Sequence, residues 1–464
     1  MFKRTEHVHF VGVGGAGMSG IAEVLRNLGY RVSGCDLKAS PATEHLQQIG
    51  CTVNLGHDAR HVEDADVVVL SSAVPADNSE ARAARRANVP VIPRAEMLAE
   101  LMRMKYSVAV AGTHGKTNTT SMVASVLQAG GLDPTVVIGG RLRTLGSHAR
   151  LGKGDFLVAE ADESDGSFLL LTPTLAVVTN IDREHMDYYG SMDALRQAFL
   201  DFLNTVPFYG ASVLCFDDDV VRALRPKATR RVLTYGFSED ADARAGDAKF
   251  EAFRSSYAAS WRGKPLGRIA LQMPGRHSIQ NSLAAVTVGL DLGISFKTIR
   301  GALEGCPSAD RRFELKGEAP SEKGGIMVVD DYGHHPTEIR ATLRAAREGW
   351  PERRLVAVFQ PHRYTRVRDL HKEFAHAFDD TAVVVVMPIY PAGEAPMEGV
   401  SAEKLSGEMK EAGHPSVHFT PGRDEAARAL ETLTREGDMV ITLGAGDVWR
   451  VGEVFLKHLE GKAA

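Results

Sequence analysis

The sequence predicts an α/β protein of three domains, each a doubly wound unit in which strands of a mainly parallel sheet alternate with helices. Two glycine-rich loops, at 12–17 and 112–117, each follow a short apolar strand and precede an amphipathic helix, the order found in nucleotide-binding sheets. The alternation of strands and helices restarts beyond residue 310. We therefore expect a Rossmann-like domain at 1–105, a P-loop ATPase-like domain at 106–310 and a second Rossmann-like domain at 311–464.

Length and composition agree with this expectation. A chain of 464 residues is long enough for about three domains. Its 44% hydrophobic and 24% charged residues are typical of globular proteins. A net charge of −5 argues against a nucleic-acid-binding protein. The sequence has no apolar run of membrane-spanning length and no signal-peptide core, so we expect a cytoplasmic protein. The four cysteines show neither a C-x-x-C pair nor metal-ligand spacing, which indicates reduced thiols.

The first glycine loop lies between a strand that starts near His7 and an amphipathic helix. Gly12, Gly14 and Gly17 follow the G-x-G-x-x-G spacing, and the next strand ends at Asp36, where a carboxylate can bind a ribose hydroxyl. NAD, FAD and a UDP-sugar all fit such a loop, because each carries a diphosphate that a helix N-terminus can bind. The predicted ligands here are Gly14, Gly15, Ala16, Gly17 and Asp36.

Two further strand ends belong to the same domain. The strand at 65–70 ends in Ser71-Ser72, and Arg94 directly follows a short strand at 90–93. An arginine in this place can bind an anion, although a surface arginine is an equally good interpretation. We include Ser72 and Arg94 among the candidate sugar-nucleotide residues.

The central domain opens with the most informative stretch, 106–131. An apolar strand ends at Ala111, a Gly-Thr-His-Gly-Lys-Thr loop follows, and the next helix ends at Gly130-Gly131. Such a loop directs backbone N–H groups and a helix N-terminus at a polyphosphate. We expect Lys116 to contact the β- and γ-phosphates of ATP and Thr117 to bind Mg²⁺. The predicted ATP loop comprises Gly112, Thr113, His114, Gly115, Lys116, Thr117 and Asn118.

This loop differs from the usual G-x-x-x-x-G-K-[ST] pattern, because Val110 stands at the position of the first glycine. A glycine turn with a solvated lysine is therefore the alternative. Because the sequence clearly predicts a strand before this loop and a helix after it, we favour a phosphate site over a simple turn.

Acidic and histidine-bearing segments follow two later strands of this domain. Glu160 comes at the end of the strand at 156–159, and His185 lies beyond the strand at 175–178. Parallel strands end at one edge of a sheet, so both residues are expected near the phosphate loop, where they could complete a Mg²⁺ site. A solvated acidic loop and a structural histidine are the alternatives.

The rest of the central domain carries weaker signals. Ser191 is expected to cap an amphipathic helix, and 238–266 to form a peripheral hairpin or excursion with little chemistry. Residues 274–277 open a helix in which His277 and Asn281 could lie against a purine. On these residues alone, a well-packed helix start is the better interpretation.

The third domain again places polar residues at its strand ends. Strands are expected at 326–329, 355–359, 383–387 and 439–443. Arg363 and Arg366 follow the second of them and could grip a carboxylate in bidentate fashion. The pair His334-His335 lacks a nearby third metal ligand, so substrate binding and a purely structural role are equally good interpretations.

Ten motifs in sequence resemble the Mur ligases of bacterial cell-wall synthesis, most closely the branch that adds L-alanine to UDP-N-acetylmuramate. They are GVGGAGMSG, AGTHGKTNTT, EADESDGSF, TNIDREHMDYYG, MPGRHSIQN, SADRRFE, DDYGHHPTEI, FQPHRYTRVRDL, IYPAGE and LGAGDVW. The resemblance implies an ATP-dependent and Mg²⁺-dependent ligase that forms an acyl phosphate on the lactyl carboxylate. L-alanine would then displace the phosphate to give the amide used in peptidoglycan precursors.

The resemblance also implies roles for individual residues. Lys116 and Thr117 would hold phosphate and metal, and Glu160 and His185 would be Mg²⁺ ligands. Residues near the nucleotide would be His277, Asn281 and Arg312. The amino acid would meet Tyr332, His334, Arg363 and Arg366, and the UDP-sugar would meet Gly14 to Gly17 and Asp36.

Two positions depart from the family pattern, and other functions remain open. Ser278 stands where the family has asparagine, which puts one adenine contact in doubt, and Asn118 replaces a threonine. A recycling ligase that adds a tripeptide to the same sugar nucleotide is the closest alternative. A nicotinamide-dependent oxidoreductase and a P-loop switch protein are alternatives of other classes. We expect a monomer or weak homodimer.

Overall fold

The computed structural model describes residues 5–71, 73–138, 149–319 and 325–463. The chain divides into two compact units, each treated by itself below. One comprises Met1–Gly246, Ala258–Ile269 and Gln280–Ala309, and the other comprises Asp247–Tyr257, Ala270–Ile279 and Asp310–Ala464. Three sheets of five, ten and six strands give the expected three-domain α/β fold. None of the described helices is long and apolar enough to cross a membrane.

The N-terminal sheet has the strand order β3-β2-β1-β4-β5, and each of its neighbouring pairs is parallel. The order reverses between β1 and β4, and ligands of such sheets bind outside the carboxyl ends at this point. The elements are β1 (His7–Val11), α1 (Ala16–Asn27), β2 (Arg31–Asp36), α2 (Pro41–Gln48), β3 (Thr52–Leu55), η1 (Ala59–Val62), β4 (Val67–Leu70), α3 (Ser79–Arg86), β5 (Val91–Pro93) and α4 (Arg94–Arg103).

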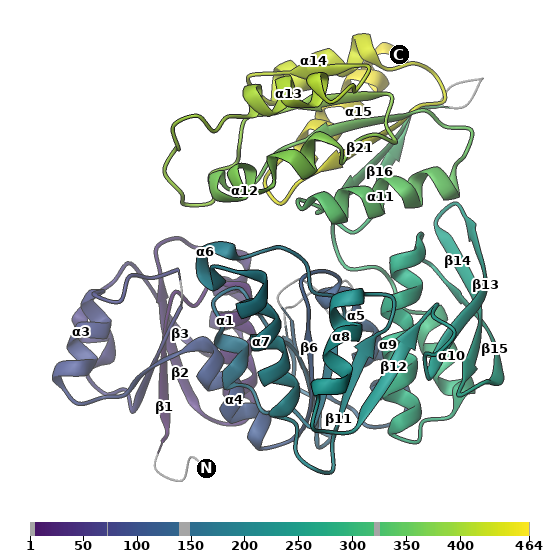
Figure 1. Cartoon of the computed structure of the whole chain (residues 1–464). Coiled ribbons are helices and arrows are strands. Elements are labelled where there is room, and N and C mark those ends of the chain that lie inside the picture. Colours follow the sequence, from purple (N-terminus) through teal and green to yellow (C-terminus); the bar gives the residue numbers. More distant parts are fainter. Residues whose placement is uncertain (1–4, 72, 139–148, 320–324, 464) are drawn as a thin grey trace. The chain divides into compact units, whose positions relative to one another are not determined.

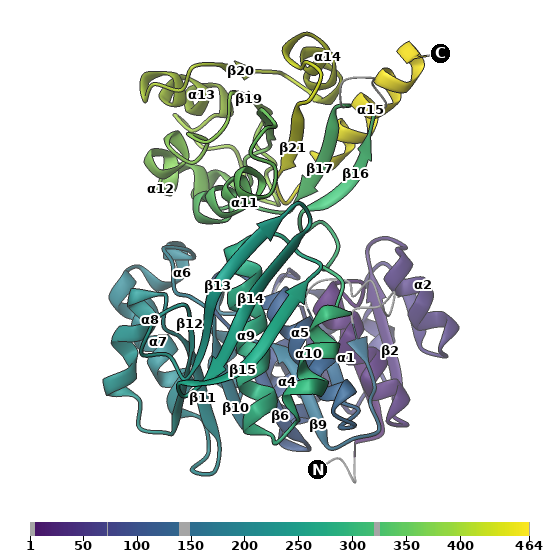
Figure 2. The same ribbon diagram turned by 90° about the vertical axis from the view of Figure 1, so that its right-hand side faces the viewer.

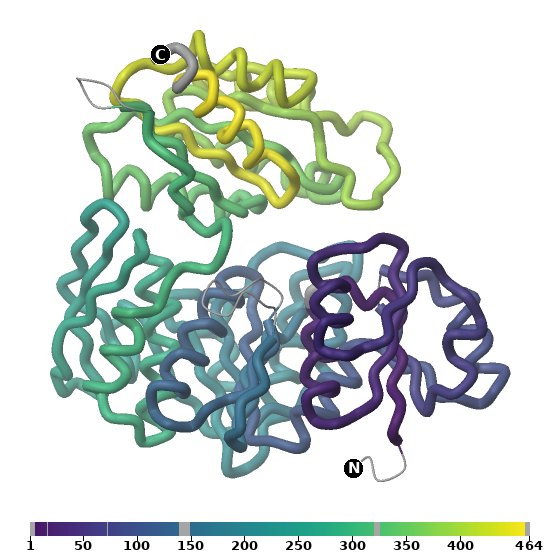
Figure 3. Tube along the Cα trace, turned by 180° about the vertical axis from the view of Figure 1, so that it is seen from behind, coloured from purple at the N-terminus to yellow at the C-terminus, as the bar shows by residue number. Residues whose placement is uncertain are grey.

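The chain then enters the central sheet, most of which belongs to the same unit (Figure 3). Its strand order is β15-β14-β13-β12-β11-β10-β6-β9-β7-β8. The elements are β6 (Tyr106–Ala111), α5 (Lys116–Ala129), β7 (Thr135–Val137), β8 (Ala149–Arg150), β9 (Phe156–Glu160), η2 (Ser167–Leu170), β10 (Leu175–Val178), α6 (Met186–Tyr189), α7 (Met192–Asn204), β11 (Ala211–Cys215), α8 (Asp219–Leu224), η3 (Arg225–Lys227), β12 (Val232–Gly236), β13 (Ala243–Glu251), β14 (Arg254–Trp261), β15 (Lys264–Leu271), α9 (Arg276–Asp291) and α10 (Phe296–Glu304).

The middle of this sheet explains where the phosphate loop lies. Strand β6 is flanked by β10 and β9 in parallel register, so all three strands end at one edge. After the exposed Tyr106, the side chains of β6 are small or β-branched and buried, which suits a strand covered on both faces. Residues 238–266, expected as a peripheral hairpin or excursion, contribute to β13, β14 and β15, which lie at one edge of the sheet.

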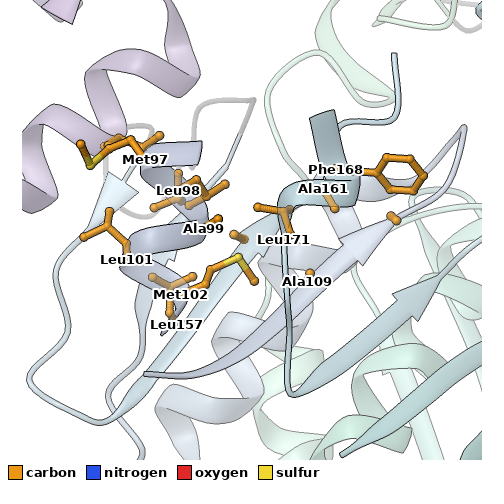
Figure 4. Packing of buried hydrophobic residues seen from close by; sticks show 14 of the residues in the cluster. Met97, Leu98, Ala99, Leu101, Met102, Ala109, Leu157, Ala161, Phe168 and Leu171 are labelled. Carbon is orange, nitrogen blue, oxygen red and sulfur yellow. The ribbon is translucent and has the colours of Figure 1, made fainter. Parts of the chain in front are cut away.

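Apolar packing joins the N-terminal domain to the central domain. Met97, Leu98 and Leu101 of α4 are buried in one cluster with Leu157 of β9 and Phe168 of η2. Figure 4 shows these side chains on neighbouring elements. This shared core fixes the end of the N-terminal domain against the sheet that carries the phosphate loop.

The C-terminal sheet has the order β16-β17-β21-β18-β19-β20 and is parallel except for β16, which runs antiparallel at the edge (Figure 2). Residues of α11, α12 and α13 pack in one apolar cluster and residues of α14 and α15 in another. The elements are β16 (Glu314–Glu318), β17 (Met327–Asp331), α11 (Pro336–Gly349), β18 (Leu355–Phe359), α12 (Tyr364–Ala375), β19 (Val383–Val386), α13 (Ala402–Glu411), β20 (Val417–Phe419), α14 (Arg423–Leu433), β21 (Met439–Leu443) and α15 (Trp449–Ala463).

Candidate active site

The loop from Gly112 to Lys116 connects β6 to α5 and requires glycine at two positions. Gly112 has φ +127°, and a Cβ there would lie 2.1 Å from Thr179 Oγ1. Gly115 has φ +81°, and a Cβ there would lie 2.8 Å from Asn281 Oδ1. A side chain at either place would be strained and would collide with its neighbour. The two glycines therefore let β10 and α9 approach the loop closely.

Asn180, which follows β10, holds the loop in shape. Its backbone oxygen accepts from Thr113 N at 3.0 Å, and its side-chain oxygen accepts from His114 N at 2.8 Å. Its amide group donates to His114 O at 3.0 Å. These bonds use two of the loop N–H groups. The first N–H groups of α5 lack intrahelical acceptors, as at any helix start, and remain the donors for a phosphate.

Lys116 lies at the first position of α5 and pairs with Glu163. Lys116 Nζ is 2.9 Å and 2.8 Å from the two Glu163 carboxylate oxygens and 2.6 Å from Gly112 O. Burial opposes the ammonium charge, but the carboxylates of Glu163 and Asp162 outweigh it and raise the pKa of Lys116. The lysine is therefore charged and held at the point where phosphate would bind.

The predicted metal ligands surround this lysine. Thr117 is the next residue of α5, and Glu160 ends β9 in register with Val110 of β6. His185 takes the left-handed conformation, φ +58°, at the start of α6, and its Nε2 lies 3.8 Å from Glu163 Oε1. The sheet edge thus brings Lys116, Glu163 and His185 together.

Glu163 is the residue that sequence reasoning missed. It is 1% exposed, and Tyr189 donates its hydroxyl hydrogen to the Glu163 backbone oxygen. The sequence indicates a site in the acidic segment Glu160–Asp165, and of its residues it favours Glu160, at the end of the strand. The short turn after β9 directs Glu163 into the interior. The conformation of this turn, which the sequence does not show, decides which acidic residue pairs with Lys116.

The remaining predicted nucleotide residues lie on both units. Asn118 Oδ1 accepts from Ala309 N at 3.3 Å, and Asn281 lies against Gly115 as described above. In the other unit, burial and the Arg312 guanidinium lower the pKa of His277 to about 4, although Glu338 opposes this shift. Ser278 donates its hydroxyl hydrogen to Pro274 O at 2.7 Å, so this hydroxyl is engaged within its own helix start.

The first glycine loop adjoins Asp36 and Arg94. Gly14 N donates to Asp36 Oδ2 at 2.9 Å, and a Cβ on Gly17 would lie 3.1 Å from Arg94 Cδ. Arg94 also forms an ion pair of 3.6 Å with Asp162 of the central domain. Arg94 therefore contacts both the first glycine loop and the acidic segment beside Lys116. Gly15 and Ala16 lie in the loop and at the start of α1, and Ser72 lies outside the described residues.

In the C-terminal domain, the predicted amino-acid residues follow β17 and β18. The guanidinium carbons of Arg311 and Arg312 each lie 5.2 Å from the centre of the Tyr332 ring. His334 Nδ1 lies 3.1 Å from Tyr332 O. His335 caps α11 by accepting from Thr337 N, which gives this second histidine a structural role.

The two arginines after β18 differ in their surroundings. Arg363, with φ +70°, forms an ion pair of 3.2 Å between its Nε and Glu394 Oε1. Arg366 is 8% exposed and donates to His362 O at 3.0 Å. His362 in turn stacks on Tyr390 with ring centres 5.5 Å apart. Arg363 is thus the more accessible of the two for a carboxylate ligand.

The chain is similar to known proteins along nearly its whole length. Three family models match in succession: "Mur ligase family, catalytic domain" at 7–106, "Mur ligase middle domain" at 110–289 and "Mur ligase, glutamate ligase domain" at 311–446. A UDP-N-acetylmuramate–L-alanine ligase from a Geobacter species is 55% identical over 460 residues, 99% of each chain. The corresponding ligase of Desulfatibacillum aliphaticivorans is 54% identical and covers 98% of this chain and 99% of its own.

Solved structures agree with the sequence relatives. The UDP-N-acetylmuramate-alanine ligase of Thermotoga maritima is 28% identical, with a TM-score of 0.80 over 98% of this chain and 99% of its own. A murein peptide ligase of Psychrobacter arcticus, at 23% identity, shares the fold with a TM-score of 0.68 over 98% of each chain.

Proposed function

The chain belongs to the Mur ligase family, and on that premise we propose that it joins L-alanine to UDP-N-acetylmuramate in an ATP-dependent step of peptidoglycan synthesis. The substrates follow from relatives that are more than half identical over nearly the whole chain. The chemistry is supported chiefly by one observation, the loop at the start of α5 that holds Lys116 beside acidic residues.

The reaction needs an activated carboxylate. A lactyl carboxylate oxygen attacks the γ-phosphorus of ATP, the bond from that phosphorus to the β-phosphate oxygen breaks, and ADP leaves. The amine of L-alanine then adds to the acyl carbon, gives up a proton, and phosphate departs as the C–O bond breaks. Both steps move negative charge between oxygens, so fixed cations and N–H donors lower the barrier.

The phosphate loop is suited to this task. Lys116 supplies a charge that is already fixed in place, and the first N–H groups of α5 point along the helix axis toward the same region. Because Glu163 holds Lys116 at 2.8 Å, an incoming phosphate must share the lysine with that carboxylate. We assign Gly112 to Asn118 to the polyphosphate, with His277, Asn281 and Arg312 near the rest of the nucleotide.

The donor groups at this edge also fit Mg²⁺. Thr117 offers a hydroxyl, Glu160 a carboxylate and His185 an imidazole, and Mg²⁺ commonly combines a few protein ligands with substrate phosphates. When bound, Mg²⁺ would neutralise phosphate charge and orient the γ-phosphate. The placement of Glu163 between Lys116 and His185 supports including it in this set.

The other two substrates are assigned to the outer domains. We place the UDP-sugar at Gly14, Gly15, Ala16, Gly17 and Asp36, with Ser72 and Arg94 beside it. Arg94 supports this assignment because it contacts both Gly17 and Asp162. We place L-alanine near Tyr332, His334, Arg363 and Arg366. ATP is a cytoplasmic substrate, so we propose a cytoplasmic reaction, catalysed by a monomer or weak homodimer.

The test is release of phosphate from ATP and Mg²⁺ in the presence of UDP-N-acetylmuramate, with L-alanine, glycine, L-serine or tripeptide added in turn. We expect release that requires both the sugar nucleotide and L-alanine. Release with tripeptide alone would assign the protein to the recycling branch. Release without any sugar nucleotide would favour a P-loop switch, and NAD binding would revive the oxidoreductase interpretation.

A further inference from the structure

A cluster of metal-binding side chains lies in the N-terminal domain, away from the phosphate loop. His9 is in the middle of β1, Cys35 is near the end of β2, and Glu80 is in the first turn of α3. One potential ligand atom from each of these three residues lies within 4.8 Å of the others. All three residues are fully buried, at 0% exposed. No role in the ligase reaction explains this cluster.

The cluster occupies one face of the N-terminal sheet. His9 pairs with Ser33 and Val11 pairs with Cys35 in parallel register, so these side chains project to the same side. The opposite side of the same strands carries Val8, Phe10 and Val32 in the large apolar core. The face that carries His9 and Cys35 is covered by η1 and α3. Helix α3 lies beside this sheet in Figure 1.

Glu80 is the centre of the cluster. Its Oε2 lies 2.9 Å from Cys35 Sγ and 2.8 Å from His57 Nδ1, and its Oε1 lies 2.6 Å from His61 Nδ1. These contacts place donor groups around a fully buried carboxylate, and burying a carboxylate is costly unless cationic or donor groups compensate it.

The hydrogen bonds behind His9 assign its tautomer. His7 Nδ1 lies 2.9 Å from Asp64 O, and since a carbonyl only accepts, that nitrogen carries a hydrogen. For a neutral His7, Nε2 then accepts from the Ser33 hydroxyl at 2.7 Å. That hydroxyl in turn accepts from His9 Nδ1 at 2.7 Å. His9 therefore directs an unprotonated Nε2 toward Glu80.

This leaves two electron-rich groups facing each other. His9 Nε2 lies 3.7 Å from Glu80 Oε1, and both side chains are fully buried. Within the part of the chain that the structure describes, His9 Nε2 has no hydrogen-bond partner. A lone pair opposite a carboxylate in a medium of low dielectric is unfavourable unless a cation lies between them.

We propose that His9, Cys35, His57 and Glu80 bind one Zn²⁺ ion. Thiolate, imidazole and carboxylate are the ligands that this cation prefers. His61 remains on Glu80 Oε1 and His7 with Ser33 orients His9, as outer partners of metal ligands commonly do. The inference is independent of the ligase assignment, because none of these residues belongs to the proposed substrate sites.

Among Cys35, His57 and Glu80 the geometry requires only a small expansion, and His9 lies with Cys35 and Glu80 in a group whose ligand atoms are all within 4.8 Å of one another. Cys35 Sγ, His57 Nδ1 and Glu80 Oε2 are 2.8 to 3.2 Å apart, whereas tetrahedral Zn²⁺ with normal bond lengths separates its donors by about 3.3 to 3.6 Å. His57 and His61 are about one-fifth exposed, at 19% and 20% of their side chains. The outer side chains can therefore shift and admit the ion from solvent.

Binding is coupled to one proton. The Cys35 thiol donates to Glu80 Oε2 at 2.9 Å, and Zn²⁺ binds the thiolate, so this proton passes to solvent when the ion binds. The hydrogen on His57 Nδ1 moves to Nε2, which leaves Nδ1 free to bind the ion.

The site lies directly behind the first glycine loop. Cys35 O accepts from both Gly12 N and Val13 N at 2.9 Å. A metal bound to the Cys35 side chain would therefore restrain the residue that holds this loop. We expect Zn²⁺ to raise the midpoint of thermal unfolding of the full chain.

The experiment uses full-length protein treated with chelator and then titrated with Co²⁺ in the absence of nucleotide and Mg²⁺. We expect one equivalent to bind with a near-ultraviolet thiolate-to-cobalt absorption, which Zn²⁺ abolishes by displacement. Cys35→Ser should lose this absorption, and Cys51→Ser should retain it, since Cys51 is another buried thiol of the same domain. His9→Gln should weaken Zn²⁺ binding at least tenfold.

The same preparation gives a test that needs no variant. Zn²⁺ should slow alkylation of Cys35 in the wild-type chain, measured by peptide mass spectrometry, and leave the rate at Cys51 unchanged. A thiolate band that survives in Cys35→Ser, binding without such a band, or absence of stoichiometric binding would overturn the proposal. If no stoichiometric binding is found, a proton on His9 Nε2 would compensate the charge of the Glu80 carboxylate instead of a metal ion.

Discussion

Lys116 and Glu163 form an ion pair at the phosphate loop, with Nζ placed 2.8 Å and 2.9 Å from the two carboxylate oxygens. The lysine also donates to Gly112 O at 2.6 Å. The side chain that is proposed to hold the γ-phosphate is therefore already oriented and charged before the nucleotide binds. This relationship leads to the first two predictions.

Lys116→Ala should reduce kcat by about 10³-fold, because a fixed charge that acts on the transferring phosphoryl group is lost. Binding of the UDP-sugar should stay intact, since the first glycine loop is in a separate domain. Steady-state phosphate release and sugar-nucleotide titration measure the two effects. Lys227→Ala, on exposed η3, is the matched control, and turnover retained by Lys116→Ala would remove this lysine from the mechanism.

Glu163→Gln should lower kcat by about 10²-fold, because a neutral amide neither balances the Lys116 charge nor helps to bind a cation. The matched change Asp165→Asn alters an exposed carboxylate of the same segment, whose Oδ1 accepts from Ser167 N, and should leave kcat within about twofold. Equal kcat values for the two variants would show that the ion pair is only structural.

Arg94→Ala should raise KM for UDP-N-acetylmuramate by about tenfold with a smaller effect on KM for ATP. The guanidinium lies against Gly17 and pairs with Asp162 at 3.6 Å, and the loss of one charged hydrogen bond accounts for a change of this size. Arg86→Ala, which changes an exposed residue of α3, serves as the control. If KM for ATP rose alone, the arginine would belong to the nucleotide site instead.

Arg363→Ala should raise KM for L-alanine more than KM for ATP. Arg363 pairs with Glu394 through one nitrogen at 3.2 Å, which leaves other guanidinium donors for a substrate carboxylate. Arg368→Ala, five residues further along the chain and paired with Asp369, is the control. An unchanged KM for L-alanine would argue against the carboxylate clamp.

His277 should make the folded state less stable in acid. Its pKa is about 4 in the folded chain, below the usual 6.5, so the unfolded chain binds the proton first as pH falls. The stability that neutral His277 provides is fully present above pH 6.5 and is lost progressively between pH 6.5 and 4. Urea unfolding across this range should show a smaller loss for His277→Gln, and identical pH profiles would contradict the assignment.

Much of the fold followed from local sequence. The apolar runs at 175–178, 355–359 and 439–443 became strands with those bounds, because β-branched residues in short runs suit buried parallel strands. Strand β16 (Glu314–Glu318) was not predicted. Its alternating polar residues resemble a loop, and only antiparallel pairing with β17 makes it a strand.

The site was less accessible to sequence reasoning than the fold. Strand ends identified the edge that carries Lys116, Glu160 and His185, but the partner of the lysine depends on how the chain turns after β9. The sequence also did not predict the buried cluster around Glu80, for a related reason. Its ligands come from four separate segments, so Cys35 shows no metal-ligand spacing along the chain, and only the parallel register of β1 and β2 brings it to His9.

The most direct test of the proposed reaction uses UDP-N-acetylmuramate in which both lactyl carboxylate oxygens are ¹⁸O. With ATP, Mg²⁺ and L-alanine, an acyl phosphate transfers one labelled oxygen to phosphate and leaves the other in the new amide carbonyl. Mass spectrometry should therefore find one ¹⁸O in each molecule of released phosphate and L-alanine added to the sugar nucleotide. Unlabelled phosphate, released while both labels stay on the sugar nucleotide, would contradict the account.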